Sequence, residues 1–304
     1  MADRTILVDI GGRRLKLSNL DKVLYPLSGF TKGQVIDYYV RVAPVLLPHV
    51  AGRPVTLRRY PDGVDGESFF EKNAPRHAPE WIRTARVPTP GSAKGTEYAD
   101  FVLIDDVPTL AWVANLAAIE LHVPQWTVGP AGGRGPTDLL VFDLDPGAPA
   151  SVVECCQVAQ LVRAALAEDG LSAYPKTSGS KGLQLYVPVT VADAGQTSAY
   201  ARSLARTLAS AHPGLVLDSM VRSRRAGKVF IDWSQNNPAK TTVAPYSLRA
   251  RPMPTVSTPL TWAEVERCGR ADDVVFTADE VRARIAQHGD LLGGLQGDHP
   301  ALPC

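Results

Sequence analysis

Residues 139–147 read Leu-Leu-Val-Phe-Asp-Leu-Asp-Pro-Gly, an apolar run that ends in two aspartates. Branched and aromatic residues favour a strand, which we expect over residues 138–144. Because side chains alternate along a strand, Asp143 and Asp145 should project to the same side. Two carboxylates this close raise each other's pKa unless a cation lies between them, and carboxylate oxygens suit a hard divalent metal. Pro146 and Gly147 should end the strand at an exposed edge, where a ligand can reach the pair.

A second apolar run also ends in a carboxylate. Residues 229–233 read Val-Phe-Ile-Asp-Trp, and we expect a strand over 228–233 that ends near Asp232. Three aspartates on neighbouring strands would form a two-metal phosphoryl-transfer site. Residues 222–251 around this run carry seven basic side chains and only Asp232 as an acid. Such local excess suits polyanion binding, although a solvated arginine-rich loop and ordinary strand-end aspartates are the simpler alternatives.

A glycine- and hydroxyl-rich stretch lies between the two carboxylate runs. Residues 175–182 read Pro-Lys-Thr-Ser-Gly-Ser-Lys-Gly and lead into an expected strand over 183–189. Glycines let backbone N–H groups turn toward an anion, while Ser178 and Lys181 can add a donor and a charge. The stretch is not a Walker A motif, because it lacks that spacing and precedes a strand. It is either a triphosphate cradle or an ordinary hairpin turn.

The rest of the chain predicts an α+β fold. Capping boxes begin four helices, after Thr31, Ser151, Thr261 and Thr277, and Gly170 should end the second of them. Further short strands are expected over 5–10, 54–60 and 101–104, and residues 84–100 suggest a hairpin or mobile loop. Helices and strands without regular βαβ alternation favour a mixed or antiparallel sheet flanked by helices, with the sheet carrying the chemistry.

Composition excludes several classes of protein. Of 304 residues, 45% are hydrophobic and 21% charged, which excludes a wholly disordered chain. No apolar run approaches the roughly 20 residues that span a bilayer, and charges interrupt the N-terminus where a signal peptide needs an apolar block. The four cysteines lack zinc-ligand spacing, so we expect no zinc. We therefore expect a soluble, cytoplasmic, nucleoid-associated protein with no membrane contact.

Taken together, the motifs resemble a known family. The order D-L-D-P-G, S-G-S-K-G-L-x-L-Y and F-I-D-W is similar to the three motifs of the archaeo-eukaryotic primase superfamily. The chain most resembles the polymerase domain of bacterial DNA ligase D and stand-alone repair primase-polymerases, from about residue 17 to 292. The resemblance implies one primase-polymerase domain over 1–304. Its implied parts are a DNA-end and template region over about 1–100, a catalytic core over about 101–250, and a helical tail over about 251–304.

The resemblance also implies roles at the catalytic centre. Asp143, Asp145 and Asp232 would bind divalent metal, usually Mn²⁺ in this family, with Mg²⁺ as the alternative. Ser178 and Lys181 would hold the triphosphate of the incoming nucleotide, and His122 would lie near its sugar. Other positions that match nucleotide, primer or metal-site contacts are Gln184, Gln235, Arg249 and Arg225.

A second implied site recognises the DNA end. The segment Ser-Asn-Leu-Asp-Lys-Val-Leu-Tyr-Pro over residues 18–26, with Lys32, resembles the family's pocket for the 5′-phosphate downstream of a gap. Asn19, Lys22 and Lys32 would grip that phosphate, and Lys32 also lies at an expected helix start, where backbone N–H groups favour an anion. The residues expected to contact template or primer are Arg58, Arg59, Phe69 and Phe70, the phenylalanines by stacking on a base.

One position departs from the family motif. The second motif usually reads S-G-x-K-G-x-H, and here Gln184 stands where the histidine is expected. Glutamine can donate a hydrogen bond but cannot become cationic or transfer a proton near neutral pH. We therefore expect a working enzyme with altered nucleotide binding or rate.

The implied function is template-dependent nucleotidyl transfer that fills short gaps at DNA breaks with a 5′-phosphate. Substrates would be gapped or broken DNA and NTP or dNTP, with ribonucleotides used readily, and the expected partners are a separate DNA ligase and Ku. Two alternatives stay open: a weakly catalytic or non-catalytic module that binds and bridges DNA ends, and a primase that needs no primer. The three aspartates argue against a pure binding module.

Overall fold

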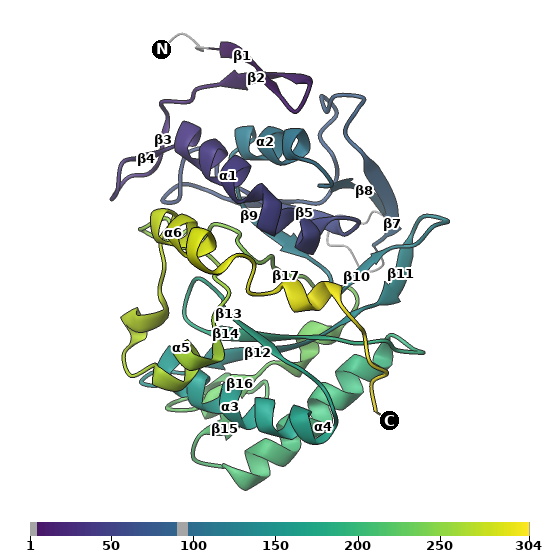
Figure 1. The fold of residues 1–304 in the computed structure, drawn as a ribbon, viewed down its shortest axis with the longest axis vertical. Helices are drawn as coiled ribbons and strands as arrows, with labels where there is room; N and C mark the ends of the chain where they lie inside the picture. Colours follow the sequence, from purple (N-terminus) through teal and green to yellow (C-terminus); the bar gives the residue numbers. More distant parts are fainter. Residues whose placement is uncertain (1–4, 90–96, 304) are drawn as a thin grey trace. The chain divides into compact units, whose positions relative to one another are not determined.

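The computed structural model describes residues 5–89 and 97–303 (Figure 1). The chain divides into two compact units, each assembled from separated segments. Unit 1 comprises Met1–Gly135, Val243–Val256 and Thr277–Gly289, and unit 2 comprises Pro136–Thr242, Ser257–Phe276 and Asp290–Cys304. The division of a single domain near residues 100 and 250 stays a prediction.

The helices begin where their capping signals lie. Thr31, Ser151, Thr261 and Thr277 each take part in a capping box, as predicted. The helix after Ser151 ends just before Gly170, which has a φ of +72°. Within the described ranges no helix is both long and apolar enough to cross a membrane. The α-helices are α1 (Lys32–Val50), α2 (Val107–Asn115), α3 (Val152–Glu168), α4 (Gly195–Ala211), α5 (Trp262–Arg267) and α6 (Ala278–His288).

Unit 1 is built on a six-stranded sheet. Its order is β17-β9-β5-β8-β7, and β6 also pairs with β5. The strands are β5 (Pro54–Arg59), β6 (Phe69–Glu71), β7 (Thr84–Pro88), β8 (Tyr98–Leu103), β9 (Ala118–Val123) and β17 (Thr242–Val243). The antiparallel pairing of β7 with β8 confirms a hairpin over 84–100, whose residues 90–96 lie outside the described part. Smaller two-stranded pairs are β1 (Thr5–Ile10) with β2 (Arg13–Ser18), β3 (Val23–Tyr25) with β4 (Phe30–Thr31), and β10 (Trp126–Val128) with β11 (Arg134–Thr137).

Unit 2 is built on a five-stranded sheet that α3 and α4 cover. The order is β13 (Tyr174–Thr177), β14 (Leu183–Pro188), β12 (Leu139–Pro146), β16 (Val229–Ile231) and β15 (Val216–Leu217). All neighbours are antiparallel except β15 and β16, so the sheet is mixed. The buried core contains Leu140, Phe142 and Leu144 of β12 packed with apolar residues of α3 and β14. The predicted α+β fold is confirmed.

The register of this sheet determines which residues face each other at the candidate active site. Asp143 lies opposite Gln184 of β14, and Leu144 lies opposite Ile231 of β16. Two glycines allow the strand ends to approach closely. A Cβ on Gly182 would lie 2.2 Å from the Leu144 carbonyl oxygen, and one on Gly147 would lie 2.0 Å from that of Arg225. Any side chain at either position would therefore push apart the backbones that carry the aspartates.

Candidate active site and DNA-end pocket

Three aspartates meet at the end of β12 and β16 in unit 2. Ligand oxygens of Asp143, Asp145 and Asp232 all lie within 4.8 Å of one another. The first two are two residues apart on β12, and the N–H of Asp232 donates to the carbonyl oxygen of Asp143 over 2.8 Å. The structure thus brings together the three carboxylates that the sequence singled out.

The triad is electrostatically unfavourable by itself. Burial raises the pKa of Asp143 to about 7, with the nearby charges of Asp145 and Asp232 adding to the effect. Burial, followed by the charge of Asp232, likewise raises the pKa of Asp145. Three carboxylates whose oxygens lie this close together are the hard donor set that a divalent cation stabilises. The residues therefore fit a divalent metal.

Residues that closely follow Asp232 in the sequence hold its carboxylate in place. One oxygen accepts from the backbone N–H of Ser234 over 3.1 Å and from its hydroxyl over 2.5 Å. The other accepts from the amide of Gln235 over 3.2 Å and lies 4.0 Å from the Lys240 ammonium. Gln235, predicted to contact the nucleotide, is therefore beside the triad, and Ser234 and Lys240 are neighbours that the sequence reading missed.

Gln184 faces the triad from β14. Its side-chain nitrogen donates to Asp143 Oδ1 over 3.0 Å, and its side-chain oxygen accepts from the ammonium of Lys176 over 2.6 Å. Gln184, at the position of the motif's histidine, thus donates one amide hydrogen to a carboxylate of the triad. Lys176, which the sequence reading quoted only as part of the loop, is fully buried behind it.

The expected phosphate loop is a tight turn between β13 and β14. Ser178 N–H donates to the carbonyl of Gly182, and its hydroxyl oxygen accepts from the N–H groups of Ser180 and Gly182. Lys181 at the tip is exposed. The stretch is therefore the turn of a β-hairpin, a geometry that both alternatives share, and its use as a triphosphate cradle stays a prediction.

Arg225 lies beside the triad as well. Its guanidinium stacks 4.1 Å from the ring centroid of Phe230, and its charge lowers the pKa of Asp145 against the stronger effect of burial. This position is compatible with the predicted contact to primer or metal site.

A second group of predicted residues surrounds a buried glutamate in unit 1. Glu120 of β9 is 1% exposed. Its carboxylate lies 2.9 Å from His122 Nε2, 3.2 Å from Arg249 Nε and 3.5 Å from Arg58 Nη1. The sequence reading missed Glu120, although Glu120 and His122 stand two apart on one strand and so share a face.

The neighbours of Glu120 keep it ionised. Hydrogen bonding from His122 and the positive charge of Arg249 hold the pKa of Glu120 at about 2, overcoming the opposing effect of burial. Burial in turn lowers the pKa of His122. The group at neutral pH is therefore an ionised glutamate that accepts from a neutral histidine and is flanked by two arginines.

Among the residues predicted to contact the template, each phenylalanine stacks on one of the arginines. Arg58 lies 5.3 Å from the ring centroid of Phe70, and the Phe70 and His122 ring centroids lie 5.7 Å apart in an edge-to-face arrangement. Arg59 lies 5.3 Å from the Phe69 ring and pairs with Glu71 over 2.9 Å. Phe69 and Phe70 are 45% and 52% exposed, so both rings are available for stacking on a base.

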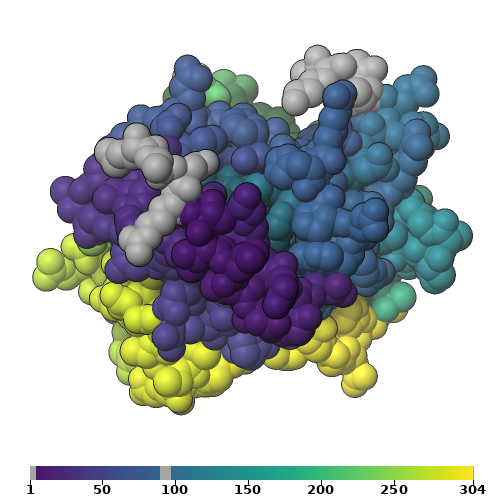
Figure 2. All heavy atoms as spheres, turned by 90° about the horizontal axis from the view of Figure 1, so that it is seen from above, coloured from purple at the N-terminus to yellow at the C-terminus, as the bar shows by residue number. Residues whose placement is uncertain are grey.

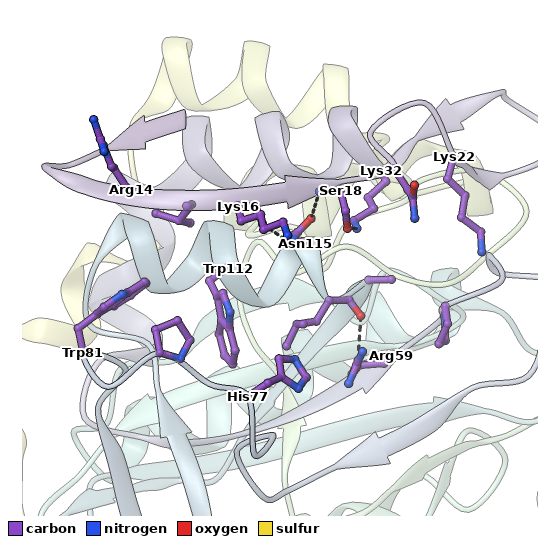
Figure 3. A pocket seen from close by; sticks show the side chains of 16 residues that line it. Arg14, Lys16, Ser18, Lys22, Lys32, Arg59, His77, Trp81, Trp112 and Asn115 are labelled. Atoms are coloured by element: carbon purple, nitrogen blue, oxygen red, sulfur yellow. Dashed lines mark hydrogen bonds between the residues drawn. The ribbon is translucent and has the colours of Figure 1, made fainter. Parts of the chain in front are cut away.

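The predicted end-recognition residues line one cavity of about 670 Å³ in unit 1 (Figure 3). Asn19 has a φ of +54° and accepts from the N–H of Lys22 in a tight turn, and the carbonyl of Lys22 accepts from the N–H of Lys32 at the first residue of α1. These bonds place the asparagine and both lysines together. In the space-filling view the β1–β2 hairpin, drawn in dark purple, lies at the surface beside the blue segments of the same unit (Figure 2).

The lining of the cavity is basic and aromatic. Among the described residues that form it, none is acidic. Lys32 donates to the Ser18 hydroxyl over 3.4 Å, while Lys22 pairs across the rim with exposed Asp62 over 2.8 Å. The basic and aromatic lining residues are Arg14, Lys16, Lys22, Lys32, Arg59, His77, Trp81 and Trp112.

Comparison with known proteins gives consistent matches. Residues 31–292 match the family model described as LigD, primase-polymerase domain. The chain is 47% identical over 291 residues to the multifunctional non-homologous end joining protein LigD of Mycolicibacterium smegmatis, covering 94% of this chain and 37% of that protein. It is 33% identical over 278 residues to the bifunctional LigD of Bacillus subtilis, covering 91% and 43% respectively. The chain thus spans less than half the length of these relatives.

A solved structure matches nearly the whole chain. The polymerase domain from Mycobacterium tuberculosis ligase D in complex with DNA superimposes with a TM-score of 0.87 at 45% identity. The match covers 94% of this chain and 99% of that one.

Proposed function

The chain belongs to the LigD primase-polymerase domain family, whose members are nucleotidyltransferases, and we propose that it fills short gaps at DNA breaks during end joining. The observation that carries the proposal is the cluster of Asp143, Asp145 and Asp232 within 4.8 Å on the matched fold. In this reaction the 3′-hydroxyl of a primer attacks the α-phosphate of a nucleotide and releases pyrophosphate.

The triad would hold the divalent ions, with Mn²⁺ proposed over Mg²⁺. Bound there, such ions would neutralise charge on the attacking and leaving oxygens. Gln184 and Ser234 keep Asp143 and Asp232 in place through the hydrogen bonds described above. We assign Ser178 and exposed Lys181 to the triphosphate, and Arg225 to the primer side of the triad.

We assign the group around Glu120 to the rest of the nucleotide and to the template. Neutral His122, whose Nε2–H donates to Glu120, can accept at Nδ1 from a sugar hydroxyl, which suits the proposed ready use of ribonucleotides. Arg249, ion-paired with Glu120, presents a guanidinium whose direction is fixed. Phe69 and Phe70 would stack on template bases irrespective of sequence.

We assign the basic cavity to the downstream 5′-phosphate and the strand that follows it. Lys22, Lys32 and Asn19 would take the terminal phosphate. Lys16 and Arg14 alternate with buried Leu15 and Leu17 along β2, and so share a face with Ser18. They can therefore offer charge to the next phosphates. Sealing the filled gap needs a DNA ligase, which with Ku completes the proposed partners.

The direct test is extension of a labelled primer across a short gap. With Mn²⁺ we expect extension that stops at the gap's end, is stronger with a 5′-phosphate than with a 5′-hydroxyl, and disappears in EDTA. NTP and dNTP are compared in parallel. Absence of metal-dependent extension, together with tight phosphate-dependent binding, would replace this function by that of an end-binding module. Product made without a primer would identify a primase.

The cavity assignment predicts a specific defect for Lys32→Ala. Loss of a charge-assisted contact to phosphate costs about 1.5–3 kcal/mol, or roughly a 10- to 100-fold loss of affinity. We expect this loss in fluorescence anisotropy with 5′-phosphorylated gapped DNA and little change with 5′-hydroxyl DNA. Arg206→Ala, which removes an exposed cation from α4, is the matched control. Equal loss on both DNAs would refute specific recognition of the phosphate by Lys32.

A further inference from the structure

Lys176 is a buried cation that the mechanism above does not use. Its side chain is 0% exposed, and its ammonium lies 2.6 Å from Gln184 Oε1, 2.6 Å from Ser257 Oγ and 5.1 Å from the ring centroid of Tyr186. Burying an ammonium is costly unless hydrogen bonds and opposite charge compensate it. The three carboxylates of the triad lie beyond Gln184, so this charge is placed where negative charge gathers.

The chemistry of the ammonium fixes the direction of the hydrogen bonds around it. A lysine can only donate, so the Gln184 oxygen must face Lys176 and the Gln184 nitrogen must face Asp143. That nitrogen donates to Asp143 Oδ1 over 3.0 Å. A neutral or accepting group at position 176 would leave the Gln184 amide free to turn its oxygen toward the carboxylate.

The second hydrogen bond of Lys176, to Ser257, does not lead to the triad. The Ser257 hydroxyl donates to the Thr177 carbonyl oxygen over 3.0 Å, and its lone pairs are left to accept from Lys176. The hydrogen bond from Lys176 to Ser257 connects β13 to a segment 81 residues later in the chain, and Ser257 in turn donates to a backbone carbonyl. Of the two hydrogen bonds described here, the one to Gln184 leads on to a carboxylate of the triad.

We propose that Lys176 is a positioning residue for the metal site, acting through Gln184 to orient the Asp143 carboxylate. One oxygen of Asp143 is thereby held by a donor of fixed direction, and the other is left to a cation. In this chain the positive charge is on Lys176, which contacts the side-chain oxygen of Gln184. The family motif instead has, at position 184 itself, a histidine that can be charged. The inference rests on the proposed metal site.

The test measures Mn²⁺ binding directly, without DNA or nucleotide, from the electron paramagnetic resonance signal of free Mn²⁺. Lys176→Met should raise the dissociation constant for Mn²⁺ by about 10- to 100-fold, the usual effect of losing the support behind a metal ligand. Ser257→Ala, the matched control, breaks the other hydrogen bond and should change it by less than about 3-fold. Thermal melting of both variants reports their folding. Should Lys176→Met fail to fold, Lys176→Gln replaces it, because its amide accepts as well as donates and cannot fix Gln184.

A double-mutant cycle assigns the effect to the relay. Gln184→Leu should weaken Mn²⁺ binding to a similar degree, and adding the Lys176 substitution should weaken it little further, since both act through one hydrogen bond. Asp143→Asn shows whether the measured ion is at the triad. If Asp143→Asn abolishes binding but the Lys176 variants bind Mn²⁺ like wild type, Lys176 is a structural residue only. If Asp143→Asn leaves binding unchanged, the metal site itself is wrong, and the relay falls with it.

Discussion

Replacing Asp143 and Asp145 by asparagine is expected to abolish primer extension, with a loss of more than about 1,000-fold, because both oxygen donors to the ions that stabilise the transition state become neutral amides. The same change should not unfold the protein. Burial and like charge already raise the pKa of both carboxylates, so the folded state pays to ionise them. We expect the double variant, without metal, to be at least as stable as wild type.

The stability of the metal-free wild type should depend on pH through Asp143. The folded-state pKa of Asp143 is raised from 3.8 to about 7, so between these values the folded protein binds a proton that the unfolded chain releases. Wild type in EDTA should therefore lose stability from this group as pH rises from about 4 to 7, whereas the variant should not. Melting temperatures in EDTA at pH 5 and pH 8 test this. A variant that melts lower than wild type at pH 8 would contradict the expectation.

Replacing Glu120 by glutamine is expected to destabilise unit 1 strongly. Glu120 is 1% exposed and its pKa is lowered from 4.5 to about 2, a shift worth about 3 kcal/mol. Neutralising it leaves Arg249 and Arg58 close together without a counter-charge, and removing one partner of a buried pair costs about 3–5 kcal/mol. Urea unfolding at pH 7 should show a loss in this range.

The stabilisation by Glu120 also depends on pH in a defined direction. A lowered pKa means that its contribution is complete above 4.5 and disappears as pH falls toward 2. The difference between wild type and Glu120→Gln should therefore shrink between pH 5 and pH 2. Glu71→Gln, which removes a less buried carboxylate with a single arginine partner among the described ion pairs, serves as control and should cost less than Glu120→Gln. Equal effects from the two substitutions would show that Glu120 is not the centre of this group.

Much of the fold and part of the candidate site could be predicted from local sequence. Capping boxes marked the starts of α1, α3, α5 and α6, because the side chains that satisfy the first N–H groups lie within three residues of one another. The period of two along a strand placed Asp143 and Asp145 on one face. No such signal marks α4, whose N-cap Ala194 offers no side-chain hydrogen bond, and it was missed.

Contacts between segments far apart in the chain could not be predicted from the sequence. Lys176 meets Ser257 across 81 residues, and Glu120 meets the N–H of Ala250 across 130, so no local spacing reveals either partner. The basic cavity likewise needs β2, α1, β5 and α2 brought together. The sequence by itself determined which residue types stand at the ends of strands and helices, since those depend on neighbours along the chain. Tertiary structure alone decided which buried charge faces which partner, because burial and Coulomb interactions depend on distance in space.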